Sequence, residues 1–431
     1  MQIEGKHVSK INLFVFAAHH LSNNIASQRF KGLLKYLDQG KYRVFVFARA
    51  GQQDPPEVSD RDGIRVYALP GHCVGSESPA MASIPILAAA FIRSLPFALA
   101  NDSKPSRQWL VTALSEADRL CRERLEAGEH SVAIGTYSPV DSLIAAASLS
   151  ARHDIACVQD FRDGLVFESL GRPGWLPRLV REIIERRVVG TRGLITSVSR
   201  PLVDDFKRRY PDKPVAVIPN GYDPADFSAL DHDAERGREA EALLASTVPA
   251  GAMLIGHFGR IGASDSSAST SLAYFIDAMN GDDAAASSQR CVMFVGELTQ
   301  DERALLERAR FPVAVLGQVD RRLALQLMKR CQKLLLLTGS RASCATGKIF
   351  EYLAAGADVV CVSGIHNAAT AILAETRAGQ TVLTSQGSQG ALSLRGAFAS
   401  PGSIDHRDIG AYSKVEQART LDHWLSRAVT V

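Results

Sequence analysis

Short runs of β-branched and aromatic residues alternate with amphipathic stretches along most of the chain, and this alternation restricts the possible folds most strongly. The first apolar runs are INLFVF, YRVFVFAR and IRVYAL, and a helical pattern, SQRFKGLLKYL, lies between the first two. Strands that alternate with helices form parallel sheets whose two faces are both covered. The sequence therefore predicts an α/β protein with doubly wound sheets.

The alternation occurs in two series that a polar stretch separates. The first series ends with PVAVIPNG and the second begins at MLIGHFG. A chain of 431 residues exceeds what one core normally holds, so we expect two domains. We assign residues 1–222 to the first, 223–252 to a linker and 253–410 to the second. A last helix within 411–431 is expected to pack back on the first domain.

Cysteine spacing and charge restrict the class of protein. The seven cysteines show no CxxC and no metal-ligand spacing, which is typical of reduced core cysteines in a cytoplasmic protein. Residues 1–220 carry 29 Lys and Arg against 23 Asp and Glu, which suits an anionic acceptor or a membrane surface. This excess is too weak to indicate nucleic-acid binding, and no acidic or histidine cluster indicates a metal site.

Residues 83–100, SIPILAAAFIRSLPFALA, come nearest to a membrane segment. They include Arg93 and two prolines and are short for a transmembrane helix. Two interpretations remain open: a helix that packs on its own domain, or a helix that touches a membrane or an acceptor. In the second case the protein would be peripheral at the inner face of the membrane.

The segment ATGKIFEYLAAGADVVCV places charged residues at a helix start before a buried strand. The first turn of this helix holds Thr346, Gly347 and Lys348, and a helix start offers free N–H groups and partial positive charge. These groups predict a phosphate or diphosphate site. Glu351 lies on the same helix face and could accept hydrogen bonds from a ribose. The alternative is that Lys348 and Glu351 form a surface ion pair.

Several segments together resemble one family of enzymes. GKIFEYLAAG is similar to the C-terminal signature of retaining glycosyltransferases of the GT-B fold, family 4. VIPNGYDPADF is similar to the family's Pro-Asn-Gly-x-Asp segment, and YSPVDSLIAAASLSARHDIACVQDFRD to a bacterial branch. The resemblance implies the GT-B architecture, in which two Rossmann-like domains face each other across a cleft. The N-terminal domain would bind the acceptor and the C-terminal domain the donor.

The resemblance also implies a reaction. A sugar would move from a nucleotide-diphosphate donor to a glycan or lipid-linked acceptor, in bacterial surface polysaccharide synthesis. The nucleotide sugar is a co-substrate, and no tightly bound cofactor is implied. The leaving diphosphate would itself accept the acceptor's proton, so the protein supplies positioning and charge.

On the donor side, the resemblance gives roles to residues at strand ends. Glu351 would hold the ribose, while Arg260 and Lys348 would stabilise the departing diphosphate as catalytic residues. The remaining donor-binding candidates are Gly259, Asn220, Glu297, Gln318, Val319, Thr346 and Gly347.

Two positions depart from the family pattern. Ser343 stands where the first glutamate of the Glu-x7-Glu pair is expected, and Asp265 lies where the family often has a lysine. These departures keep two alternatives open. One is a catalytically weakened GT-B protein that acts as a nucleotide- or glycan-binding partner subunit. The other, which PNGYD and GKIFEYLAAG disfavour, is a sugar-nucleotide epimerase.

Acceptor candidates follow strands of the first series. They come from the segments AAHHLSNNIASQRF, TYSP and QDFRDG, and comprise His19, His20, Asn23, Arg29, Tyr137, Arg162 and Asp163. His20 and Asp160 are the catalytic candidates in this region. The alternative is loop and cap chemistry for the histidine loop, and an internal brace between Asp160 and Arg162.

Overall fold

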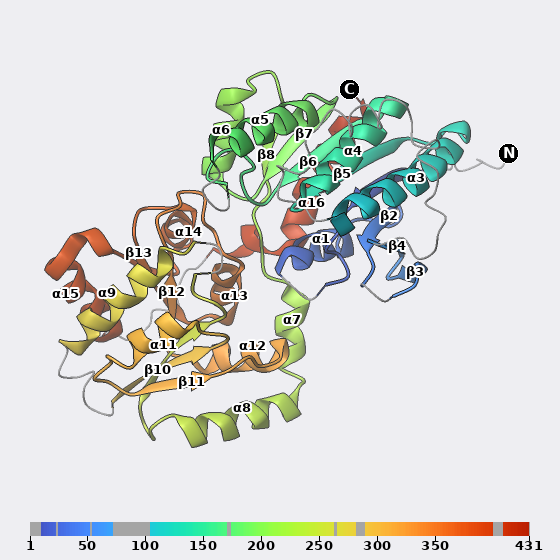
Figure 1. Cartoon of the computed structure of the whole chain (residues 1–431). Coiled ribbons are helices and arrows are strands. Elements are labelled where there is room, and N and C mark those ends of the chain that lie inside the picture. Colours follow the sequence, from blue (N-terminus) through green and yellow to red (C-terminus); the bar gives the residue numbers. More distant parts are fainter. Residues whose placement is uncertain are drawn as a thin grey trace. The chain divides into compact units, whose positions relative to one another are not determined.

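The computed structural model contains two compact units, each built around one sheet (Figure 1). The structure describes residues 10–22, 25–51, 54–71, 104–169, 174–262, 265–281, 289–399 and 408–430. Unit 1 comprises Met1–Pro219 and Val415–Val431, and unit 2 comprises Asn220–Lys414. In both units strands alternate with helices, which confirms the predicted α/β class.

Unit 1 contains an eight-stranded sheet with the order β3-β4-β2-β1-β5-β6-β7-β8. Its strands are β1 (Ile11–Phe16), β2 (Tyr42–Arg49), β3 (Glu57–Arg61), β4 (Ile64–Leu69), β5 (Ser131–Tyr137), β6 (Ala156–Phe161), β7 (Gly193–Ser197) and β8 (Val215–Val217). Only β3 is antiparallel to its neighbour. The strand order reverses between β1 and β5, which makes this the topological switch point of the sheet.

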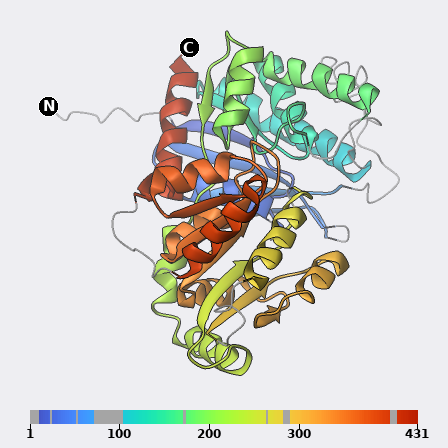
Figure 2. The ribbon, with the colours of Figure 1, turned by 90° about the vertical axis from the view of Figure 1, so that its left-hand side faces the viewer.

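Helices cover both faces of this sheet because its central strands are apolar on both sides. The helices are α1 (Ile25–Lys35), α3 (Lys104–Glu126), α4 (Val140–His153), α5 (Trp175–Val189), α6 (Arg200–Arg209) and α16 (Lys414–Thr430). Phe14 of β1 packs in one core with α3, α4 and α5. Leu13 faces the opposite side, as alternation along a strand requires, and packs with α1 and α16. Leu421 of α16 fills this second core, and Figure 2 shows α16 along the blue strands.

Unit 2 contains a six-stranded parallel sheet with the order β11-β10-β9-β12-β13-β14. Its strands are β9 (Met253–Phe258), β10 (Arg290–Val295), β11 (Val313–Leu316), β12 (Lys333–Leu337), β13 (Asp358–Ser363) and β14 (Gly379–Leu383). Its helices are α7 (Pro224–Leu230), α8 (Ala234–Thr247), α9 (Ala268–Asn280), α11 (Gln300–Leu306), α12 (Arg321–Arg330), α13 (Gly347–Ala355), α14 (Ala368–Thr376) and α15 (Gly387–Ala399). Numbered within the unit, this is the Rossmann order 3-2-1-4-5-6, with its switch point between β9 and β12.

The predicted linker, residues 223–252, is instead helical and belongs to unit 2. Asp223 and Asp233 cap the two helices, because their carboxylates accept hydrogen bonds from backbone N–H groups in the first turns of α7 and α8. Leu230 and Ala240 are buried in the core of unit 2. The mostly polar exposed face of α8 explains why the sequence pattern suggested a linker.

None of the helices in the described part of the chain is both long enough and apolar enough to cross a membrane. The stretch 83–100, for which we predicted a membrane contact, lies outside the described residues. Cys73 also lies outside them, whereas the other six cysteines are buried free thiols.

Candidate functional site

In unit 2, the ends of β9 and β12 bring the predicted donor residues together at the switch point. Gly259 and Arg260 follow β9, while β12 leads through a loop into α13. Gly259 has a φ of +77°, and a Cβ at this position would lie only 3.2 Å from Cε of Lys348. Glycine therefore allows the lysine to lie directly against the end of β9.

Lys348 makes two polar contacts at this strand end. Its Nζ donates a hydrogen bond to the carbonyl oxygen of Arg260 and lies 3.4 Å from Nε2 of His257. His257 is fully buried, and its Nδ1 lies 3.0 Å from the carbonyl oxygen of Leu335. Since a carbonyl only accepts hydrogen bonds, Nδ1 carries the proton and Nε2 is free to accept one from Lys348.

The electrostatic state of this pair follows from burial. Burial lowers the pKa of Lys348 to about 8, so most of the lysine is still charged at pH 7. Burial, and secondarily the charge of Lys348, lower the pKa of His257 well below its ordinary value. The imidazole is therefore neutral, and it places the ammonium group without competing with it as a second cation.

Lys348 and Arg260 have no carboxylate partner among the described residues. Arg260 is exposed, and its guanidinium makes no hydrogen bond or ion pair with any residue in the described ranges. The alternative of a Lys348–Glu351 ion pair is wrong, because Lys348 turns to β9 while Glu351 pairs elsewhere. Two cations that form no ion pair within the described ranges and lie at one switch point favour an anionic ligand.

The start of α13 adds further donors beside Lys348. Thr346 precedes the helix, but its hydroxyl caps no backbone group, and Oγ1 is buried without a partner in the described part of the chain. Within the same ranges, the backbone N–H groups of Gly347 and Lys348 also lack partners. Together with the partial positive charge of the helix start, these groups form an anion-binding cradle.

Glu351 is already bound to a cation. Its Oε1 accepts a hydrogen bond from Nη1 of Arg321, whose Nη2 donates to Oδ2 of Asp226 at 2.8 Å. Arg321 thereby connects α12, α7 and α13 within unit 2. Any ribose contact of Glu351 would use its second carboxylate oxygen.

Asp265 joins two loops at the switch point. Its Oδ1 accepts hydrogen bonds from the backbone N–H and the hydroxyl of Ser267, and Oδ2 accepts one from the N–H of Arg341 at 2.9 Å. Burial raises the pKa of Asp265, but these hydrogen bonds outweigh burial and hold the pKa below its ordinary value. Asp265 thus fixes the loop after β12, in which Ser343 is buried.

The other predicted donor residues lie at neighbouring strand ends. Glu297 is exposed and lies just after β10. The residue before it, Gly296, lies close to the end of β9, since a Cβ on Gly296 would be 3.0 Å from Cα of Gly259. Gln318 is exposed after β11, and Val319 packs against the core. Asn220 is half-buried where unit 2 begins. Three of these four residues therefore follow strands of the sheet whose switch point holds Lys348.

In unit 1, a small pocket of about 10 Å³ lies at the switch point between β1 and β5. It is lined by Ala17, Ala18, His19, His20, Ser27, Phe30, Thr136, Ser138 and Arg162. The structure therefore brings three predicted acceptor residues together: His19, His20 and Arg162. Tyr137 is buried and packs against Phe161. Asn23 lies outside the described residues.

Both histidines of this pocket are neutral at pH 7 and lie among cations. Burial lowers the pKa of His19, and two nearby arginines add to the effect. Burial, together with Lys31 and Arg61, lowers the pKa of His20 to about 4. Nδ1 of His20 is buried and has no hydrogen-bond partner among the described residues. This imidazole is suited to exchange a hydrogen bond with a ligand, and not to act as a cation.

Asp160 and Arg29 form a buried ion pair beside the pocket. Nη2 of Arg29 lies 2.7 Å from Oδ1 of Asp160 and Nε lies 3.1 Å from Oδ2, while the hydroxyls of Thr136 and Thr196 donate to the same carboxylate. Arg29 also donates to the carbonyl oxygen of Pro219 at 2.9 Å. Because the carboxylate already receives four hydrogen bonds from the protein, we assign Asp160 a positioning role and not a catalytic one.

The alternative of an Asp160–Arg162 brace is wrong. Arg162 donates instead to the backbone carbonyl oxygens of Tyr137 at 2.7 Å and Ser138 at 3.2 Å, which holds the end of β5. Burial lowers the pKa of Arg162, and the half-buried Asp163 opposes this shift. Arg29 of α1, and not Arg162, forms the ion pair with the carboxylate of Asp160.

Sequence reasoning missed two residues of the donor region. His257 stands in GHFGR, and a histidine at an inward position of an apolar strand was a usable signal. Arg321 stands in the run Asp320-Arg321-Arg322, whose composition is typical of a solvated helix start. That interpretation fits Asp320, which caps α12, but no sequence signal indicates that Arg321 pairs with Glu351, 30 residues away.

Comparisons with known proteins agree with this geometry. Residues 26–221 match the family described as glycosyl transferase 4-like domain. No curated protein sequence matches the chain.

Among solved structures, the chain is similar to a UDP-forming α,α-trehalose-phosphate synthase from Burkholderia xenovorans in complex with glucose-6-phosphate (12% identity, TM-score 0.62, covering 96% of this chain and 99% of that one). It is also similar to HepE from Anabaena in complex with UDP and glucose (14%, 0.59, 97% and 99%). A third is a trehalose-6-phosphate protein from E. coli bound with UDP-2-fluoro glucose (13%, 0.58, 98% and 99%).

These identities are low, so the structural similarity establishes the fold and not the substrate. It confirms the predicted GT-B fold with two Rossmann-like domains. The domain match covers most of unit 1 and supports the predicted enzyme class. The chain has the GT-B fold, and its residues 26–221 match a glycosyl transferase 4-like domain, which agrees with the enzyme class that the sequence predicts.

Proposed function

We propose that this protein is a retaining glycosyltransferase that moves a sugar from a nucleoside-diphosphate donor to a glycan or lipid-linked acceptor in bacterial surface polysaccharide synthesis. The observation that carries the donor assignment is the cluster at the start of α13, where Lys348 and Arg260 lack carboxylate partners beside unpaired N–H groups in the described part of the chain. A diphosphate has enough acceptor oxygens for all these donors. Two structural neighbours hold UDP or a UDP-sugar, which supports uridine as the first base to test.

In the proposed reaction, the bond between the anomeric carbon and the leaving phosphate oxygen breaks, and negative charge develops on that oxygen. Lys348 and Arg260 stabilise this charge, together with the helix start. The leaving diphosphate takes the proton of the acceptor hydroxyl, and the new glycosidic bond forms on the face that the diphosphate leaves. Configuration is therefore retained without a protein base. Glu351 holds the ribose through the oxygen that Arg321 does not use.

Unit 1 supplies the acceptor pocket in this proposal. His20 exchanges a hydrogen bond with an acceptor hydroxyl, while the Asp160–Arg29 pair fixes the strand ends that form the pocket. The surrounding cations favour an acceptor that carries phosphate, as a lipid-linked saccharide does. The neighbour with bound glucose-6-phosphate supports a phosphorylated acceptor. A cytoplasmic location and a membrane contact through residues 83–100 remain predictions within this proposal.

A second candidate is a nucleotide-binding partner subunit without transfer activity. Asp265 and Ser343 favour it, because the first occupies backbone N–H groups of the loop after β12 and the second replaces a sugar-binding glutamate. Donor turnover separates the two functions. An enzyme releases nucleoside diphosphate from its donor in the presence of acceptor, whereas a partner subunit binds the nucleotide and leaves the donor intact.

The first experiment is a calorimetric titration with UDP, GDP and ADP, followed by a turnover assay with the sugar donor of the base that binds. Lys348→Ala and Arg260→Ala should each weaken diphosphate binding about tenfold, since each removes a charge-assisted hydrogen bond. Lys329→Ala is the matched control, because Lys329 pairs with Asp231 on the surface of the same unit. If both cluster variants bind as tightly as wild type, the donor site has been assigned to the wrong residues.

A further inference from the structure

Helix α5 lies on the surface of unit 1, yet the side of the helix that faces solvent carries a stripe of apolar side chains. Trp175 is 79% exposed, Leu176 41%, Leu179 45% and Ile183 38%. Leu179 follows Trp175 by four residues and Leu176 by three, and Ile183 follows Leu179 by four, which places all of them on one side of the helix. The opposite side of α5 packs in the core of unit 1, so packing inside the domain does not explain this stripe.

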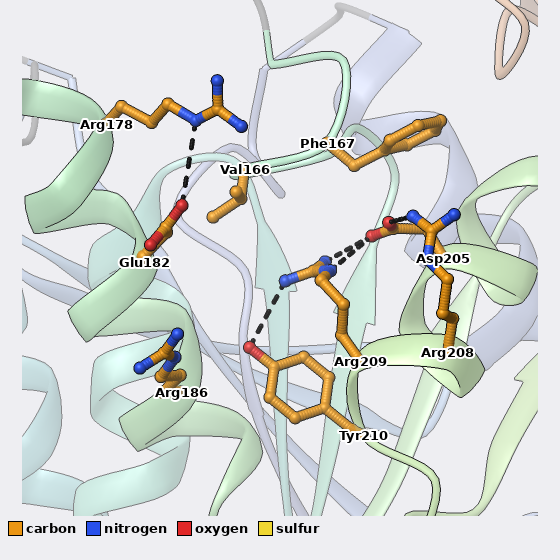
Figure 3. Close-up of a pocket in the computed structure, with 9 residues that line it drawn as sticks. All are labelled: Val166, Phe167, Arg178, Glu182, Arg186, Asp205, Arg208, Arg209 and Tyr210. Carbon is orange, nitrogen blue, oxygen red and sulfur yellow. Dashed lines mark hydrogen bonds and ion pairs between the residues drawn. The ribbon is translucent and has the colours of Figure 1, made fainter. Parts of the chain in front are cut away.

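Helix α5 also contributes to a pocket that is lined by several arginines, which Figure 3 shows. The pocket has a volume of about 340 Å³. Its charged lining residues come from two helices: Arg178, Glu182 and Arg186 from α5, and Asp205, Arg208 and Arg209 from α6. Nε of Arg178 lies 3.7 Å from Oε1 of Glu182, and the carboxylate of Asp205 pairs with Arg208 and Arg209. The guanidinium of Arg186 is exposed and makes no ion pair or hydrogen bond with any described residue. The pocket is therefore cationic.

The solvent-exposed surfaces of α5 and α6 carry a net positive charge. Together the two helices contain eight Lys and Arg residues against four Asp and Glu residues. Two of these acids, Glu185 and Asp205, are buried and bound by Arg209. Most of the cations are exposed, so the apolar stripe lies in a basic surrounding.

We propose that the exposed side of α5 binds the surface of a membrane that contains anionic lipid, with the stripe among the headgroups and the arginine pocket around a lipid phosphate. Tryptophan prefers the membrane interface, and apolar side chains beside it lose contact with water there. Arginine binds phosphate through paired N–H groups, and each cation near an anionic leaflet adds attraction. The proposal concerns residues other than 83–100 and holds whether or not the donor assignment is correct.

A second copy of the chain fits this surface less well than a lipid. In a two-fold dimer the same patch would face itself. The exposed Arg186 and Arg208 of the two copies would then lie close to each other without added acidic groups. An anionic leaflet instead complements both the stripe and its basic surrounding.

Sedimentation with vesicles tests the proposal on the full chain. Vesicles of phosphatidylcholine with phosphatidylglycerol should bind the protein, and vesicles of phosphatidylcholine alone should bind it much less. The double variant Leu179→Ser/Ile183→Ser should reduce binding about tenfold or more, because two apolar side chains no longer leave water. Arg186→Glu should reduce it severalfold and in a salt-dependent manner. Leu392→Ser is the matched control: Leu392 is 58% exposed but lies on α15 of unit 2.

Tryptophan fluorescence locates the contact. Trp175 is the exposed tryptophan, whereas Trp109 is fully buried and Trp424 is half-buried. Anionic vesicles should shift the emission to shorter wavelength, and lipids with brominated chains should quench it. Trp175→Phe should abolish the shift and keep most of the sedimentation.

Four results would overturn the proposal. They are no binding to anionic vesicles, equal binding to neutral vesicles, unchanged binding of the Leu179/Ile183 double variant, and a dimer in solution that this variant converts to a monomer. The last result would assign the stripe to a second copy. Melting temperatures near the wild-type value establish that the variants are folded.

Discussion

The two switch points occupy equivalent places in their sheets, yet they treat buried charge in opposite ways. In unit 1, Asp160 and Arg29 neutralise each other, and two threonine hydroxyls fill the remaining acceptor positions. In unit 2, the only hydrogen-bond partners of the Lys348 ammonium among the described residues are a carbonyl oxygen and a neutral imidazole. The first arrangement is complete without a ligand, and the second leaves positive charge that a ligand can use. A buried charge indicates a binding site only when the protein leaves it unpaired.

The largest expected effect concerns the buried Asp160–Arg29 ion pair of unit 1. Arg29→Ala leaves the carboxylate of Asp160 buried beside two hydroxyls, and should lower the free energy of unfolding of unit 1 by about 3–5 kcal/mol. Urea denaturation followed by circular dichroism measures this loss. The double variant Arg29→Ala/Asp160→Ala should recover part of it, since no unpaired charge remains. A loss below about 1 kcal/mol in the single variant would remove the contrast with unit 2.

The corresponding change in unit 2 should separate binding from stability. Lys348→Met removes a charge that has no carboxylate partner in the described ranges, so the free energy of unfolding should stay within about 0.5 kcal/mol of wild type or rise. Nucleoside diphosphate binding should nevertheless fall about tenfold. Thermal unfolding with and without UDP measures both quantities. A marked loss of stability without ligand would show that Lys348 is a structural cation, like Arg29.

The low pKa of Lys348 predicts a pH dependence that unit 1 should not share. Its folded pKa of about 8 lies below the ordinary 10.5, so the free protein releases this proton as pH rises through 8. A bound diphosphate favours the charged lysine, and affinity should therefore fall by up to about tenfold for each pH unit above 8.

Calorimetry between neutral and alkaline pH measures this fall, and buffers of different ionisation enthalpy should reveal proton uptake on binding. Lys348→Arg provides the control, since arginine stays charged throughout this range and should flatten the profile. The stability of the ligand-free protein should change in the opposite direction to ligand affinity. The unfolded chain holds the lysine proton more tightly than the folded protein, so the free energy of unfolding should rise as pH rises from about 8 towards 10.5. Equal pH profiles for wild type and Lys348→Arg would contradict the assignment.

The smallest effect concerns the imidazole behind the lysine. His257→Leu removes the acceptor that places the Lys348 ammonium and should weaken diphosphate binding about threefold, an effect of about 0.7 kcal/mol. Titration of the variant with UDP measures it. A loss as large as that of Lys348→Ala would mean that His257 itself contacts the ligand. No loss would mean that the Arg260 carbonyl alone places the lysine.

The sequence predicted the repeating elements and several strand-end residues, because periodicity and helix-start chemistry are local properties. It placed Lys348, Gly347 and Arg260 at strand and helix ends, and the topology brings those ends together. Pairings between distant side chains were not predictable in this way. Arg29 reaches Asp160 across 131 positions, and no local pattern distinguishes this partner from the nearby Arg162.

The helices α7 and α8 illustrate the same limit for domain boundaries. Their composition is polar because most of α8 faces solvent, and a solvated helix has the same composition as a linker. The capping aspartates, Asp223 and Asp233, were the local signals that favoured helices. The role of Asp265 was also hidden, since its partners include a backbone group of a loop more than 70 positions away.

The return of α16 to unit 1 has a consequence for the order of events on the ribosome. Leu421 and its neighbours on α16 complete one core of unit 1, yet they are translated only after all of unit 2. At synthesis rates of about 5–20 residues per second, unit 1 therefore waits on the order of ten seconds or more with one sheet face partly uncovered. Unit 2, although second along the chain, is the first whose residues are all available. Nascent unit 1 is thus the natural client for a chaperone that shields apolar surface during synthesis.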